Sequence, residues 1–178
     1  MKFFSQLVSF VPVVVLGAVG TMAQSSDTVI TAIEAFTAKS SALCTTVRGL
    51  DFSNFVDTGS EIIRGLDDIT TAVTRLNSEF SSTTPAYTDP VAAKVVNVLT
   101  TFVAVYQELL IFIMSKHSLA AQFFLAGPIR NSLRALEAAV NTFSSDLIPL
   151  IPTQSGPAMT QISALKVTFA ECLQTYSY

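Results

Sequence analysis

The large apolar residues of this chain recur every three or four positions, which is the spacing of one face of an α-helix. In the first such stretch, after residue 25, that face carries Val29, Ile33, Phe36, Ser40, Leu43, Cys44 and Val47. Similar stretches follow, and together they predict five helices near residues 26–48, 53–81, 89–115, 118–148 and 157–176. Apolar and polar residues do not alternate over any sustained length, so the pattern gives no support for strands.

The segments between these stretches contain residues that start, stop or bend a helix. Gly49 ends the first helix, and the turn-rich loop STTPAYTDP leads into the third, which Asp89 caps with Pro90 in the first turn. The Gly127-Pro128 step is predicted to break or kink the fourth helix. The sequence therefore predicts an all-α fold, a single-domain bundle of about five helices over residues 24–178.

The third predicted helix is apolar around more than half of its circumference. Its second half reads LTTFVAVYQELLIFIMS and contains one charged residue, Glu108. Inside a bilayer Asn97, Gln107 and Glu108 would all need polar partners, which argues against a membrane span. Such a helix lies at the centre of a bundle. Its apolar surface then either packs against other helices or lines a central apolar cavity, and spacing alone leaves both interpretations open.

The first 23 residues have the pattern of a secretory signal peptide. Lys2 precedes an apolar run, and Thr21 and Ala23 place small residues before a cleavage point. We therefore expect residues 1–23 to be removed and the product to be secreted. The ending CLQTYSY has no apolar tail, so a lipid anchor is not expected. With 10 Lys and Arg against 13 Asp and Glu, and no basic cluster, nucleic acid is not an expected partner.

Candidate catalytic and metal-binding groups are few. His117 is the single histidine, and Asp67 and Asp68 are adjacent, so they face different sides of a helix. No motif marks a nucleophilic serine, a zinc site or a phosphate-binding loop, and we expect no enzyme, no metal and no cofactor. Cys44 and Cys172 both fall on apolar helix faces. In a secreted chain they predict one disulfide, and the alternative is two buried free thiols.

Three stretches of the chain resemble one fungal family. SDTVITAIEAFTAKSSAL opens the first helix, SKHSLAAQFFLAGPIRNSLRALEAAVNTF lies in the middle, and LIPTQSGPAMTQISALKVTFAECLQTY follows. Their spacing is similar to that of the hydrophobic surface-binding protein A family, also called antigenic cell-wall galactomannoproteins. The resemblance covers residues 27–176. His117 departs from it, because the family usually has a lysine there, and the cysteine pair is not a family hallmark.

The resemblance implies a secreted, non-enzymatic helical protein, and some members bind fatty acids between their helices. A long-chain fatty acid or similar lipid would then lie between the third, fourth and last predicted helices. The candidate lining residues are Phe102, Tyr106, Leu109, Phe112, Ile113, Phe123, Phe124, Leu136, Val140, Phe143 and Phe169. The candidate donors to its carboxylate are Tyr106, Gln107, Lys116, His117 and Arg130.

The resemblance also implies an alternative function. Other members adsorb to hydrophobic surfaces, where they recruit secreted hydrolases, and some are cell-wall antigens. A protein of this kind would contact its substrate through exposed apolar patches or by opening its bundle. The sequence does not choose between these functions.

Overall fold

The protein folds as a bundle of five long helices, as the sequence predicted. The computed structural model describes residues 25–80 and 85–177, so the predicted signal peptide lies outside the described residues. The long helices are α1 (Ser26–Arg48), α3 (Ser60–Glu79), α4 (Asp89–Ser115), α6 (Ala126–Leu147) and α7 (Ser155–Thr175). Two short helices, α2 (Phe55–Thr58) and α5 (His117–Gln122), and two 3₁₀ turns, Ile148–Leu150 and Pro152–Gln154, connect them. The all-α prediction is confirmed for the part of the chain that the structure describes.

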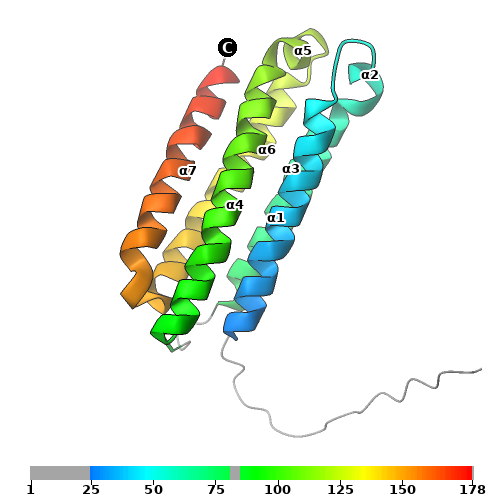
Figure 1. Cartoon of the computed structure of the whole chain (residues 1–178). Coiled ribbons are helices and arrows are strands. Elements are labelled where there is room, and N and C mark those ends of the chain that lie inside the picture. Colours follow the sequence, from blue (N-terminus) through cyan, green and yellow to red (C-terminus); the bar gives the residue numbers. More distant parts are fainter. Residues whose placement is uncertain (1–24, 81–84, 178) are drawn as a thin grey trace, which may run out of the picture.

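The long helices alternate in direction along the chain. Helices α1, α4 and α7 run one way and α3 and α6 run the other, with α4 between α1 and α7 (Figure 1). Helix α4 packs against α1 on one side and α7 on the other, while α3 packs against α6 and α1. Helices α6 and α7 touch each other over less of their length. The five apolar faces therefore enclose one shared interior.

Helix α4 is the central helix of this bundle. By length and composition alone Asp89–Ser115 is long and apolar enough to cross a membrane. In the structure it buries ten side chains against its neighbours, among them Leu99, Phe102, Tyr106 and Leu110. Packing on two sides thus accounts for the unusual apolar content of the LTTFVAVYQELLIFIMS stretch.

Two breaks differ from the predicted helix boundaries. The second predicted helix is interrupted at Gly59, where a Cβ atom would lie 2.6 Å from the backbone oxygen of Phe55. In the fourth, the chain leaves the helix at residues 123–125, and Gly127-Pro128 lies inside the first turn of α6. Proline is tolerated there because the first turn has no intrahelical acceptor for its missing N–H group.

The predicted disulfide is not formed in the structure. Both cysteines are free thiols, and both are buried. Cys44 lies on α1 and Cys172 on α7, and these helices contact α4 from opposite sides (Figure 1). The Cys172 Sγ atom lies 3.9 Å from the Leu110 carbonyl of α4. The sequence placed both cysteines correctly on inward faces but could not show that α4 separates them.

We therefore expect a reducing agent to leave the midpoint of thermal unfolding unchanged. Burial raises the pKa of Cys172 to about 12, which keeps this thiol protonated and unreactive at neutral pH. A thiol reagent should label neither cysteine in the folded protein and both after unfolding in denaturant. An intact mass two hydrogens below that of the free-thiol chain would contradict this expectation.

Candidate functional site

Aromatic rings from four helices meet in the middle of the bundle. The Phe36 ring of α1 contacts Phe102 of α4 and Phe143 of α6 edge-on, with centroids 6.3 and 6.4 Å apart. Along α4 the Tyr106 ring continues this contact, 5.5 Å from Phe102 and 5.4 Å from Phe169 of α7. Each such pair contributes about 0.5–1.5 kcal/mol beyond its buried area. The interior is therefore a connected aromatic cluster.

The Tyr106 hydroxyl lies inside this cluster without a hydrogen-bond partner. Its side chain is completely buried, and its oxygen makes no hydrogen bond with any described residue. Burial raises the Tyr106 pKa well above 10.0, and the nearby Cys172 adds to this shift. The hydroxyl is therefore neutral and remains available as a hydrogen-bond donor. A buried tyrosine hydroxyl usually has a partner, so this one is unusual.

A second buried hydroxyl, that of Ser40, also lacks a hydrogen-bond partner in the described part of the chain. Ser40 is fully buried on α1, four residues after Phe36, just as Tyr106 is four residues after Phe102 on α4. The two phenylalanine rings touch and the two helices run in the same direction (Figure 1). Each of the two helices therefore carries a buried, unpartnered hydroxyl about one turn after a phenylalanine of this contact.

Three of the five donors predicted from the sequence have a buried polar atom without a partner. They are Tyr106 through its hydroxyl, His117 through Nε2 and Arg130 through Nε. The His117 ring packs edge-on against Tyr176 at the α5 end of the bundle, with centroids 4.9 Å apart. The other two donors are occupied. Gln107 donates to the Thr168 hydroxyl at 3.0 Å, and Lys116 Nζ donates to the Leu50 carbonyl at 2.6 Å.

Most of the predicted lining residues are packed together in the interior. The buried ones are Phe102, Tyr106, Leu109, Ile113, Leu136, Val140, Phe143 and Phe169. Phe112 and Phe123 are partly buried at its edge. Phe124 points into solvent with 90% of its surface exposed, so the structure does not place it in the interior. Three surface hollows between helices lie elsewhere.

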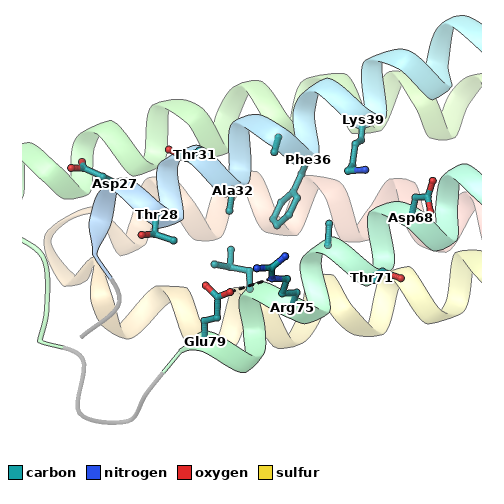
Figure 2. Close-up of a pocket in the computed structure, with 13 residues that line it drawn as sticks. Asp27, Thr28, Thr31, Ala32, Phe36, Lys39, Asp68, Thr71, Arg75 and Glu79 are labelled. Carbon is teal, nitrogen blue, oxygen red and sulfur yellow. Dashed lines mark ion pairs between the residues drawn. The ribbon is translucent and has the colours of Figure 1, made fainter. Parts of the chain in front are cut away.

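The largest of these hollows is a groove between α1 and α3, with a volume of about 730 Å³. Such a volume lies within the range of small-molecule sites. Small side chains on the facing helices, Ala32, Ala35 and Ala72, leave the groove open. Figure 2 shows the Phe36 ring pointing from α1 into the space between the two helices. Sequence reasoning missed this groove because alanines on a helix carry no signal that separates close packing from open space.

Phe36 connects the groove with the interior. It forms part of the groove wall, and its ring also contacts Phe102 and Phe143 on the inner side. The rim carries charges of both signs. Arg75 pairs with Glu79 at 3.5 Å near one end, while Lys39 and Asp68 lie toward the other (Figure 2). The groove thus has an apolar floor, a charged rim and one aromatic side chain between it and the aromatic interior.

Comparison with known proteins gives one informative likeness. No protein-family model matches the chain, and no curated protein matches it in sequence. Among solved structures, the crystal structure of AfMP4p in complex with palmitic acid is similar, with a TM-score of 0.75. The match has 12% sequence identity and covers 86% of this chain and 100% of that one. Identity this low does not show membership of the family that the sequence resembles. The chain therefore shares the helical-bundle fold of AfMP4p, a protein whose structure contains bound palmitic acid.

Proposed function

We propose that this protein binds a lipid with one long acyl chain, such as a fatty acid, in the interior enclosed by its five helices. The observation that carries this proposal is the pair of buried, unpartnered hydroxyls of Ser40 and Tyr106 within an aromatic interior. The shared fold with a protein crystallised with palmitic acid supports it. The lipid's polar head would pair with one of these hydroxyls, and its chain would lie among the surrounding aromatic and aliphatic side chains.

Two contributions to the binding free energy favour a lipid in the interior. An unsatisfied buried polar group costs about 1–3 kcal/mol, and a ligand head group that accepts a hydrogen bond removes this cost. Each buried methylene of the chain contributes about 0.8 kcal/mol, so a long chain offsets the cost of ordering the ligand and moving side chains aside. Because Ser40 and Tyr106 are both uncharged, the site favours a neutral head, such as a protonated acid or an alcohol, over a bare carboxylate.

The groove between α1 and α3 is the proposed access route. A chain lying on the floor formed by Ala32, Ala35 and Ala72 reaches the interior when the Phe36 ring changes rotamer. Tight helix packing would resist this change, but the three alanines leave room on the outer side of the ring. Binding is therefore expected to shift Phe36 and its contacts with Phe102 and Phe143.

Titration of delipidated protein with palmitic acid tests the proposed function. We expect saturable binding of one palmitic acid per chain, seen as a mass increase in native mass spectrometry and as heat in calorimetry. Hexadecanol should compete with palmitic acid, because neither hydroxyl requires a negative charge on the head group. An unchanged mass and no heat at several temperatures would overturn the proposal.

We further propose that the protein is secreted and acts without catalysis. The signal-peptide pattern of residues 1–23 supports secretion, and the lack of a catalytic sequence motif supports a non-enzymatic role. Sequencing the N-terminus of protein recovered from the culture medium of a secreting host tests the first part. A secreted protein that begins at Gln24 is the expected result.

A further inference from the structure

One end of the bundle carries a cluster of apolar side chains, three exposed and one partly buried, which we call the aromatic tip: Phe52, Val56, Phe124 and the partly buried Phe123. They come from two segments about seventy residues apart in sequence, around α2 and around α5, and both segments lie at the same end (Figure 1). The Phe52 and Phe123 rings lie 5.7 Å apart, and Phe123 stacks on the buried Phe55 at 5.3 Å. Phe52, Val56 and Phe124 expose 67, 70 and 90% of their surfaces.

The backbone of Phe124 is strained in a way that holds its ring in solvent. Its φ angle is +59°, the left-handed conformation that normally falls to glycine where a helix ends. The Phe124 N–H group donates to the Ala121 carbonyl, and the Leu125 N–H group donates to the Ala120 carbonyl at 2.8 Å. These bonds close α5 and fix the position. Phe124 therefore has an unfavourable backbone conformation and an apolar ring exposed to water. No contact with another described residue of the free protein compensates for these two costs.

The other half of the tip is held by its own hydrogen bonds. The Asp51 carboxylate accepts from the Ser53 N–H group at 2.8 Å, and the Asn54 side-chain amide donates to the Gly49 carbonyl at 2.9 Å. From below, Lys116 Nζ donates to the Leu50 carbonyl at 2.6 Å. Phe52 is therefore presented on a loop that is already ordered, so little conformational freedom is lost when its ring is buried.

The charges around the tip indicate which surface it fits. Asp51 and Asp57 are exposed beside Phe52 and Val56, and Lys116 lies close by. Acidic groups at the rim would be repelled by an anionic membrane, whereas a zwitterionic surface offers both signs. Aromatic side chains with polar neighbours favour the boundary between lipid head groups and chains.

We propose that the aromatic tip docks on the surface of a zwitterionic phospholipid bilayer, with the rings of Phe52 and Phe124 inserted among the lipids. Docking buries the two rings that the free protein leaves in water. It brings the α2–α5 end of the bundle to the membrane and leaves the α1–α3 groove accessible from the side. This inference rests on the tip alone and does not depend on a ligand in the interior.

Flotation of the full-length mature protein with phosphatidylcholine vesicles tests the proposal. The protein should float with the vesicles at both low and high salt, because apolar insertion is not screened. Phe124→Asn, which suits the left-handed backbone, and Phe52→Asn should each lower the partition coefficient roughly tenfold. Ile111→Gln is the matched control, since Ile111 is a large apolar residue of α4 with 55% of its surface exposed on the side of the bundle. This variant should float as the wild type does.

Three results would overturn the proposal. They are wild-type protein that stays with the aqueous fraction, equal loss in Ile111→Gln and Phe124→Asn, or binding that requires anionic vesicles and disappears at high salt. Circular dichroism of each variant separates loss of docking from loss of folding, and Phe52→Asn provides an independent measurement if Phe124→Asn is unfolded. Failure here with normal palmitic acid binding would remove the docking surface and leave the proposed function intact.

Discussion

Replacing Tyr106 by phenylalanine is expected to make the lipid-free protein more stable and to weaken lipid binding. The change removes a completely buried hydroxyl that lacks a partner, and it keeps the ring that packs on Phe102 and Phe169. The free energy of unfolding should rise by about 1–3 kcal/mol. In a chain of this size each kcal/mol raises the melting temperature by about 2–4 °C. The affinity for palmitic acid should fall about tenfold, because the head group loses its donor.

Tyr176→Phe is the matched control for this variant. Tyr176 is also buried, but its hydroxyl donates to the Ile113 carbonyl at 2.8 Å. Its removal should lower the free energy of unfolding by about 1 kcal/mol and leave palmitic acid affinity unchanged. Opposite signs for two buried tyrosines would be hard to explain by general packing. A Tyr106→Phe protein that is less stable than the wild type would show that this hydroxyl has a structural partner, such as a bound water molecule.

The second large effect is expected at alkaline pH. Burial raises the pKa of Cys172 from 9.0 to about 12 and raises the pKa values of Tyr106 and Tyr176 above their usual 10.0. Above pH 9–10 the unfolded chain releases these protons and the folded chain keeps them, so rising pH favours unfolding. Stability from these groups is fully present below pH 9 and is lost as pH rises toward their folded pKa values.

The size of this loss follows from the number of groups. Each contributes at most about 1.4 kcal/mol per pH unit, so these three together lower the free energy of unfolding by up to about 4 kcal/mol per unit above pH 10. Urea unfolding at a series of pH values from 8 to 11 measures it. In Tyr106→Phe the slope should be smaller, because one of the groups with a raised pKa is gone. A free energy of unfolding that stays constant up to pH 11 would contradict the burial of these groups.

Much of the bundle could be predicted because helix signals are local. The spacing of Val29, Ile33 and Phe36 defines the inner face of α1, and the Asp89-Pro90 pair marks the start of α4. The break at Gly59 could not be predicted, since the close approach of Gly59 to Phe55 is visible only in the folded chain. The sequence also pointed to Gly127-Pro128 as the break, although a proline in the first turn is compatible with a helix.

The sequence predicted which side chains could donate hydrogen bonds at the candidate site better than it predicted where those side chains lie. The sequence identified Tyr106, His117 and Arg130 as donors, and the structure leaves a buried atom of each without a partner. Ser40 was taken as one position of an apolar face, because a serine gives no sign that its hydroxyl will be buried beside aromatic rings. Phe124 was assigned to the interior from its residue type, and only the backbone at the end of α5 turns it outward.

The choice of packing partners among the long helices also has a consequence for how the chain folds. Each long helix packs on the one two places later, so the main side-chain links join residues about sixty positions apart, as in Arg48–Glu108, Asn77–Ala139 and Tyr176–Ile113. A bundle of successive hairpins instead forms through local contacts, and folding rates fall as the mean sequence separation of contacts rises. This protein is therefore expected to fold slowly for an all-helical domain. Helix α1 has no α4 to pack on until more than half of the chain has been synthesised.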